Sequence, residues 1–132
     1  MKVSFDFDST LDRNDVQQFA KELIADEHEV WIITSRHSDE SAKSKSWWWV
    51  LNQNKNLFDV ANKCGIREEH IHFTNGVDKV NFIKGKGFAF HLDDDIDELI
   101  LILDNSDPCV PLHVDHFEWK ENCLEVLNKQ SR

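Results

Sequence analysis

Two aspartates near the start of the chain have a spacing that suits acid–base chemistry or metal binding. They lie in residues 3–11, VSFDFDSTL, where an apolar run ends in Asp-x-Asp-x-Thr. Such a run is typical of a short strand, along which side chains alternate between two faces. We therefore expect Asp6 and Asp8 to lean toward one point, while Phe5 and Phe7 face a core.

Two carboxylates held this close together repel each other, so we expect a cation between them. Without one, a proton would stay on one carboxylate or the fold would lose stability. A hard cation that prefers oxygen ligands, such as Mg²⁺, fits the pair. The alternative is a strand end that runs into a polar turn, with Asp8, Ser9 and Thr10 as turn and helix-cap residues.

The composition favours a compact soluble protein. At 132 residues the chain has room for one domain of ordinary size, so we expect residues 1–132 to form a single domain. A net charge of -10 disfavours a general binder of nucleic acid or anionic membranes, because such proteins carry a basic surface. Nucleic acid is therefore an unlikely partner, although a small local basic patch remains possible.

The sequence also predicts a cytoplasmic protein that does not contact a membrane. The chain enters its first strand directly after Met1-Lys2, and no later apolar run reaches membrane-spanning length. The three cysteines, Cys64, Cys109 and Cys123, are far apart and in no metal-binding spacing. We interpret them as buried or incidental thiols in a reducing compartment.

The rest of the chain alternates between strand and helix patterns. Strands are predicted after the first one at 29–34, 70–73, 88–92 and 110–114. Helices are predicted from residue 12 or 14 to about 26, over 38–63 with a break at the polar run 52–56, over 77–83 and over 117–127. Residues 96–103 fit either element, and we favour a helix. This order predicts an α/β fold with a mainly parallel sheet of about five strands and helices on both faces.

Polar clusters follow three of these strands at their carboxyl ends. Asp6 and Asp8 end the first strand, Thr34-Ser35-Arg36 the second and Asp93-Asp94-Asp95 the fourth. Ligands of parallel α/β sheets bind beyond the carboxyl ends of the strands. We therefore expect the three clusters to meet at one edge of the sheet.

The same residues resemble the signatures of the haloacid dehalogenase superfamily of phosphohydrolases. The four signatures are matched in order by residues 6–10 (DFDST), by Thr34 after an apolar strand, by Lys79, and by Asp93-Asp94 after an apolar strand. The resemblance spans about Val3 to Glu98 and implies a Rossmann-like three-layer sandwich. Too few residues separate the signatures for an inserted cap domain, so the chain looks like a small capless member.

The resemblance implies a role for each matched residue. Asp6 would be the nucleophile that forms an aspartyl-phosphate, and Asp8 the general acid and base. Mg²⁺ would be held by Asp6, by the backbone carbonyl of Asp8 and by Asp93 or Asp94. Charge neutralisation is required, because a phosphate monoester is a dianion that repels an attacking carboxylate.

Six further residues are expected around the phosphoryl group. Thr34 would donate its hydroxyl to a phosphoryl oxygen, and Lys79 would spread positive charge over the transferring group. Ser9 and Thr10 would add hydrogen bonds, and Ser35 and Arg36 follow the second strand as substrate-binding candidates. A salt bridge from Arg36 to Asp39 or Glu40 is an alternative to phosphate contact.

Several assignments stay open at the level of sequence. Lys84 and Lys86 compete with Lys79, which we favour because it starts a helix at the sheet edge. Which of residues 93–95 would touch the metal is undecided, and Asp97 could support the site or simply begin a helix.

The histidines offer weaker signals. His70 and His72 would share a strand face, and His113, Asp115 and His116 are spaced closely enough to suggest a metal cluster. Surface or strand packing is the favoured interpretation for both groups.

Three consecutive tryptophans, Trp47 to Trp49, follow Lys43 and Lys45. All three cannot face inward from one helix, so at least one is expected to be exposed. It could contact a substrate, a partner or another copy of the chain, which makes a homo-oligomer possible. Core packing with one incidental exposure is the favoured alternative.

The function expected from these residues is hydrolysis of a phosphate monoester of unknown identity. A nucleotide, a nucleic-acid end, a phosphoprotein or a small metabolite would each fit the signatures. A phosphotransferase with the same intermediate is one alternative. A phospho-acceptor regulatory module and a catalytically silent binding module on the same fold are others.

Overall fold

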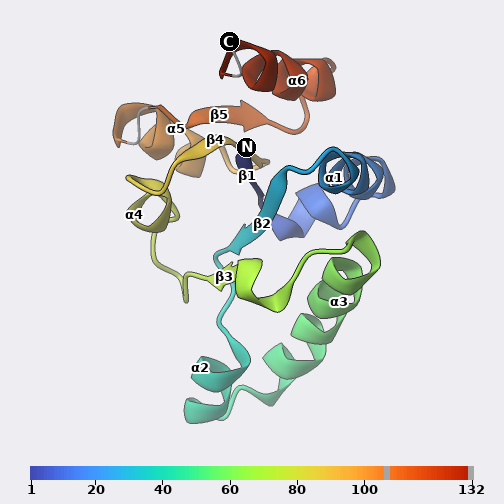
Figure 1. Ribbon diagram of the computed structural model, residues 1–132. Helices are drawn as coiled ribbons and strands as arrows, with labels where there is room; N and C mark the ends of the chain where they lie inside the picture. The colour runs from blue at the N-terminus through green and yellow to red at the C-terminus, as the bar shows by residue number, and fades with distance from the viewer. Residues whose placement is uncertain (106–107, 131–132) are drawn as a thin grey trace.

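A five-stranded parallel sheet forms the centre of the molecule (Figure 1). The computed structural model describes residues 1–105 and 108–130. The strands are β1 (Lys2–Phe5), β2 (Glu29–Thr34), β3 (Ile71–Phe73), β4 (Phe88–Asp93) and β5 (Val110–His113), in the order β3-β2-β1-β4-β5. Every neighbouring pair is parallel. The predicted α/β fold is confirmed, with a sheet that is parallel throughout rather than mainly parallel.

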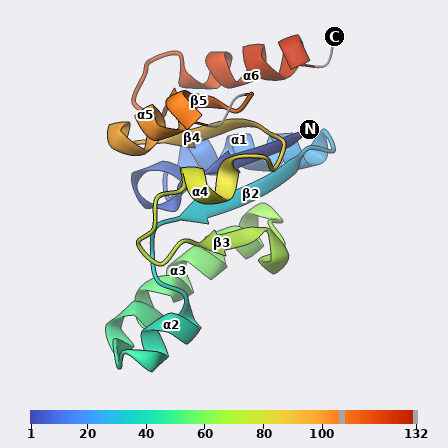
Figure 2. The same cartoon turned by 90° about the vertical axis from the view of Figure 1, so that its left-hand side faces the viewer.

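Helices cover both faces of the sheet. They are α1 (Asn14–Ala25), α2 (Asp39–Ser44), α3 (Trp48–Cys64), α4 (Val80–Ile83), α5 (Ile96–Asn105) and α6 (Trp119–Gln130), with a π-helical turn η1 (Phe7–Leu11) and a 3₁₀ turn η2 (Glu68–His70). Buried side chains of α1, α3 and α6 form one core with the sheet, and those of α4 and α5 form another. Figure 2 shows α4 in front of the sheet and α1 behind it. The fold is therefore a three-layer, Rossmann-like sandwich.

The strand order places a topological switch point between β1 and β4. The chain runs from β1 outward through β2 to β3, and then returns to the other side of β1 for β4 and β5. Ligands of open parallel sheets bind where the order reverses in this way. Asp6 directly follows the last residue of β1, and Asp93 is the last residue of β4. Both aspartates therefore lie at the switch point.

The central strands are buried on both faces. All six residues of β4 are buried, and residues 3–5 of β1 are fully buried. Phe5 sits at the centre of the larger core, where its ring meets those of Phe19 and Phe90 edge-on at centroid distances of 6.2 and 5.8 Å. Edge-on pairing is a favourable geometry for aromatic rings, and it fixes α1 against β1 and β4.

A bulge in β4 changes which side chains face each layer. Lys2 pairs with Phe88 and Ser4 with His91, so β4 contains one more residue than β1 between these two pairs. A one-residue shift moves all later side chains of a strand to the opposite face. As a result, His91 lies opposite Ser4, and both are fully buried.

The break between α2 and α3 is the main difference from the predicted elements. The polar run 52–56 was expected to interrupt the helix, but α3 continues through it and the break lies at residues 45–47. Ser46 there has a φ of 58°, which ends α2. Asn54 is fully buried inside the run, and its amide donates to the His37 carbonyl and to Asp39, both at 2.9 Å. Tertiary hydrogen bonds therefore stabilise the helix where its sequence predicted a break.

Other boundaries differ by smaller amounts. The helix predicted over 77–83 is confined to α4, and Val77 lies exposed in the preceding turn. Residues 96–103 are helical, as favoured, within the longer α5. The strands predicted over 70–73 and 110–114 each lose one residue, since His70 belongs to η2 and β5 ends at His113.

All three cysteines are buried and free. Burial raises the pKa of the Cys109 thiol to about 12, which keeps it protonated and unreactive near neutral pH. Across residues 1–105 and 108–130, no helix combines the length and the apolar character that crossing a membrane requires.

We expect Phe5→Ala to lower the free energy of unfolding by about 3–5 kcal/mol, because it leaves a cavity among Phe19, Phe90 and their neighbours. Urea denaturation followed by circular dichroism measures this change. Phe117→Ala is the matched control, since the Phe117 side chain is 85% exposed and its loss should change stability by no more than about 0.5 kcal/mol. Equal effects of the two substitutions would contradict this assignment of the core.

Candidate functional site

Three carboxylates meet at the carboxyl edge of the sheet, at the switch point between β1 and β4. Ligand oxygens of Asp6, Asp93 and Asp94 all lie within 4.8 Å of one another. Asp6 is held by its backbone amide, which donates to the Leu92 carbonyl at 2.9 Å. Asp6 and Asp93 are buried, whereas Asp94 is partly exposed. The structure therefore brings together residues of the first and fourth clusters.

Asp95 has a different position from its two neighbours. One of its carboxylate oxygens accepts hydrogen bonds from the backbone amides of Asp97 and Glu98, in the first turn of α5. Its own amide donates to Asp93 at 3.0 Å. Asp95 therefore begins α5 and orients Asp93, and Asp97 contributes its amide to the start of this helix.

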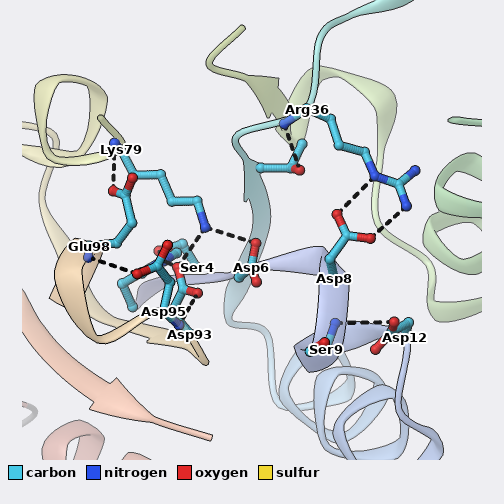
Figure 3. Close-up of polar contacts among 12 residues, drawn as sticks. Ser4, Asp6, Asp8, Ser9, Asp12, Arg36, Lys79, Asp93, Asp95 and Glu98 are labelled. Atoms are coloured by element: carbon cyan, nitrogen blue, oxygen red, sulfur yellow. Dashed lines mark hydrogen bonds and ion pairs between the residues drawn. The ribbon is translucent and has the colours of Figure 1, made fainter. Parts of the chain in front are cut away.

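Lys79 is the cation between the two buried carboxylates (Figure 3). Its ammonium donates to Asp6 at 2.8 Å and to Asp93 at 2.6 Å, and the side chain is only 3% exposed. The backbone amide of Lys79 donates to Glu98 at 2.9 Å, which fixes the residue at the start of α4. Lys84 and Lys86 are exposed, so the structure places Lys79 in this position, as favoured from the sequence.

The burial of these charges changes their proton affinities. Burial, together with the charge of Asp93, raises the pKa of Asp6 to about 9. Burial also acts to raise the pKa of Asp93, but the hydrogen bonds from His91 and Lys79 and the positive charge of Lys79 outweigh it and hold that pKa below its usual range. For Lys79, burial is outweighed by the two carboxylates, and its pKa is raised. The cluster therefore holds Lys79 as an ammonium and Asp93 as a carboxylate.

His91 and Ser4 support Asp93 from inside the protein. His91 Nε2 lies 2.8 Å from an Asp93 oxygen, and its Nδ1 lies 2.8 Å from the Ser4 hydroxyl. Burial lowers the pKa of His91, so a neutral imidazole donates from Nε2 to Asp93 and accepts at Nδ1 from Ser4. Sequence reasoning missed both residues. The spacing of His91 and Asp93 was an available signal, because residues two apart share one face of a strand.

Asp8 points toward Arg36 and away from Asp93 and Lys79 (Figure 3). Its carboxylate forms a two-pronged ion pair with Arg36, at 2.7 Å from Nη2 and 2.9 Å from Nε, and the side chain is 54% exposed. The expectation that Asp6 and Asp8 lean toward one point is therefore wrong. Strand β1 ends at Phe5, and the chain enters η1, where Ser9 has a φ of 59°, so strand alternation no longer applies. Phe5 and Phe7 are fully buried, as expected.

Arg36 follows β2 as predicted, but its partner is Asp8 and not Asp39 or Glu40. The guanidinium carbon also lies 5.0 Å from the centre of the Phe7 ring. These contacts hold the Arg36 side chain at the same edge of the sheet as the acidic cluster.

The predicted hydroxyl residues lie at this edge, with Thr34 as the last residue of β2 and the others in the segments that follow β1 and β2. Thr34 is fully buried, and its Oγ1 accepts from the Arg36 amide at 3.2 Å. Thr10 is also buried, and its hydroxyl has no hydrogen-bond partner among the described residues. Ser9 and Ser35 are exposed, with the Ser9 amide donating to Asp12 at 3.1 Å.

The four histidines singled out from the sequence pack or stabilise turns, as favoured there. His70 stacks on Trp31 and His72 on Phe82, with centroid distances of 4.7 and 3.7 Å. His113 accepts from the amide of Asp115, and His116 from that of Glu118. Within the described part of the chain, the metal-like group is Asp6, Asp93 and Asp94, and these histidines do not belong to it.

The tryptophan run is largely on the surface. Trp48 and Trp49 are each 58% exposed, which confirms the expectation of at least one exposed ring. The favoured interpretation, core packing with a single incidental exposure, is wrong, because two of the three rings lie on the surface. Trp47 is partly buried, and it contacts the His37 ring edge-on at 5.0 Å.

The three carboxylates suit a hard divalent cation, because they supply closely spaced oxygen donors on a rigid sheet edge. An ammonium within hydrogen-bond distance of Asp6 adds positive charge at the same place. With a divalent cation bound, the arrangement would be able to hold an anionic group beside a carboxylate. Comparisons with protein-family models, with curated proteins and with solved structures found no match to this chain.

The raised pKa of Asp6 predicts a pH-dependent effect of Asp6→Asn on stability. The Asp6 pKa rises from 3.8 to about 9, so between these values the folded protein holds a proton that the unfolded chain has lost. Each rise in pH within this window therefore favours unfolding of the wild type, whereas asparagine does not titrate. We expect the melting temperature of Asp6→Asn, relative to wild type, to increase between about pH 5 and pH 9.

Scanning calorimetry with a chelator present measures this difference. Asp59→Asn is the matched control, because it makes the same chemical change at an exposed site of α3, outside the buried cluster. A relative melting temperature of Asp6→Asn that stays level or falls with pH would contradict the raised pKa.

Proposed function

We propose that this chain is a Mg²⁺-dependent phosphohydrolase of the haloacid dehalogenase kind, which hydrolyses phosphate monoesters through an aspartyl-phosphate on Asp6. The observation that carries the proposal is the position of Asp6, in contact with the Lys79 ammonium and grouped with Asp93 and Asp94. A carboxylate can approach a dianionic phosphate only where positive charge offsets the repulsion.

The residues that would hold Mg²⁺ are Asp6, Asp93 and Asp94. When bound, the ion supplies Lewis-acid chemistry, because it neutralises charge on the phosphoryl oxygens. Asp93 is prepared for this role by His91, Lys79 and the Asp95 amide, which fix its two oxygens. Supporting hydrogen bonds of this kind orient metal-binding carboxylates in proteins.

Asp6 acts as the nucleophile in this proposal in its ionised form, which a bound divalent cation would favour over the protonated form that burial favours without one. One of its carboxylate oxygens forms a bond to phosphorus while the bond from phosphorus to the leaving oxygen breaks. Lys79 stabilises the negative charge on the transferring group and keeps the Asp6 side chain oriented. Thr34 and the unpartnered Thr10 hydroxyl are available to donate to phosphoryl oxygens, with Ser9 and Ser35 nearby in sequence.

Asp8 serves as the general acid and base once Arg36 releases it. The phosphate of an incoming substrate competes with Asp8 for the Arg36 guanidinium, which forms two-pronged contacts with either anion. Asp8 then protonates the leaving oxygen and later takes a proton from the water that attacks the aspartyl-phosphate. That attack restores the Asp6 carboxylate and releases inorganic phosphate.

The Asp8–Arg36 ion pair also favours a second candidate, a phospho-acceptor regulatory module. If Arg36 keeps Asp8 paired, no general base reaches the aspartyl-phosphate and the phosphoryl group persists on Asp6. This candidate predicts a stable Asp6 phosphorylation after treatment with a small phosphodonor, whereas the phosphohydrolase predicts rapid loss of the phosphoryl group.

The proposal is tested by hydrolysis of 4-nitrophenyl phosphate with Mg²⁺ and with a chelator. We expect turnover that requires Mg²⁺ and falls by at least about 10³-fold in Asp6→Asn, because the nucleophile is lost. Asp26→Asn provides the control for the same chemical change at an exposed site. Activity that survives in Asp6→Asn would remove Asp6 as the nucleophile, and insensitivity to the chelator would contradict the metal assignment.

The role of Asp8 predicts a dependence on the leaving group. We expect Asp8→Asn to lower kcat about 10²- to 10⁴-fold for an alkyl phosphate, whose leaving oxygen needs a proton. The loss should be much smaller for 4-nitrophenyl phosphate, because its leaving group departs without protonation. Asp12→Asn alters the same turn and serves as the control. Equal losses with both substrates would argue against general-acid catalysis by Asp8.

A further inference from the structure

A pocket of about 270 Å³ is lined by Arg36, the residue that forms the ion pair with Asp8. Its lining residues are Arg36, His37, Trp47, Trp49, Val50 and Gln53. They come from the end of β2 and from the start of α3, where the break at residues 45–47 turns the chain. The pocket is therefore one side chain away from the residue that would protonate the leaving group.

Arg36 connects the pocket to Asp8 through fixed contacts. Its Nε and Nη2 bind Asp8, while its Nη1 donates to the backbone carbonyl of Gln53 at 2.8 Å. The guanidinium thus has the candidate catalytic acid on one side and a pocket wall on the other. A substrate whose leaving oxygen lies at Asp8 would extend its leaving group in this direction.

The wall of the pocket is aromatic. The rings of Trp47 and Trp49 have centroids 6.1 Å apart and are tilted by 31°. Trp47 is held in place by His37 and by the Lys45 ammonium, which lies 5.3 Å from its centroid. Trp49 remains 58% exposed, so a ring face is available for contact. Exposed apolar area of this kind, bordered by polar residues, marks binding surfaces.

We propose that this pocket binds a planar aromatic ring carried by the leaving group, so that the substrates are phosphate monoesters of ring-bearing alcohols, such as nucleoside monophosphates. This inference rests on the proposed function. Stacking on tryptophan favours planar rings over sugars and aliphatic chains. The amide of Gln53 and the imidazole of His37 add polar groups that can recognise a ring edge.

The size and charge of the site favour a small substrate. A volume of about 270 Å³ is slightly below the usual range of ligand pockets and suits one ring system rather than a polymer segment. The net charge of -10 also disfavours a nucleic-acid chain. Trp48 is as exposed as Trp49 but does not line the pocket, which provides a matched control.

The first test compares adenosine 5′-monophosphate with ribose 5-phosphate, which share the same leaving oxygen and differ by the base. We expect kcat/KM to be about tenfold to a hundredfold higher for the nucleotide, the range that one stacked base provides. Trp49→Ala should remove most of this preference, and Trp48→Ala should retain it. Equal kcat/KM values for the two compounds, or a preference that survives Trp49→Ala, would overturn the proposal for nucleobases.

A second arm distinguishes nucleobases from other aromatic rings. The value of kcat/KM for phosphotyrosine is measured in the wild type, in Trp49→Ala and in Trp48→Ala. Because the same substrate is used with all three proteins, the reactivity of its leaving group does not affect the comparison. A loss of kcat/KM confined to Trp49→Ala for phosphotyrosine, without such a loss for the nucleotide, assigns the pocket to phenolic rings. If Trp49→Ala lowers kcat/KM for neither compound, the proposed ring pocket is overturned altogether.

A binding measurement separates this inference from the proposed function. Adenosine 5′-monophosphate and ribose 5-phosphate are titrated into Asp6→Asn by calorimetry, with and without Trp49→Ala in the same chain. Tighter binding of the nucleotide that weakens about tenfold or more with Trp49→Ala supports the pocket even if the wild type shows no turnover. Equal binding of both compounds overturns the pocket even if the phosphatase reaction is established.

Discussion

The rest of the site depends on one buried interaction, the Lys79 ammonium between Asp6 and Asp93. Removing charges from water costs several kcal/mol per ion, and a buried pair is retained only if further hydrogen bonds satisfy it. His91 and the Asp95 amide provide those bonds to Asp93, and Glu98 holds Lys79 in place by accepting from its backbone amide. One ammonium is shared by two acidic groups, and burial and the charge of Asp93 still raise the pKa of Asp6. This edge is therefore a place where the fold gives up stability, as functional sites commonly do.

The parallel sheet explains how residues from distant parts of the chain reach this interaction. Strands β1 and β4 are neighbours, although more than eighty residues separate them, and their ends present Asp6 and Asp93 side by side. The bulge in β4 then sets the facing of His91, which lies behind Asp93 with Ser4. Without the extra residue, strand alternation would place His91 on the opposite face. A local irregularity thus completes a polar network that a regular strand could not form.

The features that could be predicted from the sequence are those set by strand patterns. Apolar runs that end in polar clusters located Asp6, Thr34 and Asp93 at one edge, since the carboxyl ends of parallel strands share an edge. The direction of Asp8 could not be predicted, because it depends on the π-helical turn and on Arg36 from another strand. The break before α3 was misplaced for a similar reason. A buried Asn54 reads as a helix breaker until its distant partners are known.

The misplaced break and the turned Asp8 have a common structural basis. Because α2 ends at Ser44 and α3 begins at Trp48, the first turns of α3 bring Gln53 and Trp49 beside Arg36. Arg36 in turn holds Asp8 away from Asp6. A group that enters the tryptophan pocket would contact the residue that pairs with Asp8, and a phosphate at Asp6 would draw the same guanidinium. The position of the break therefore places the tryptophan pocket, which would select a leaving group, next to Arg36. Through this one side chain the pocket is connected to Asp8, which would protonate the leaving group.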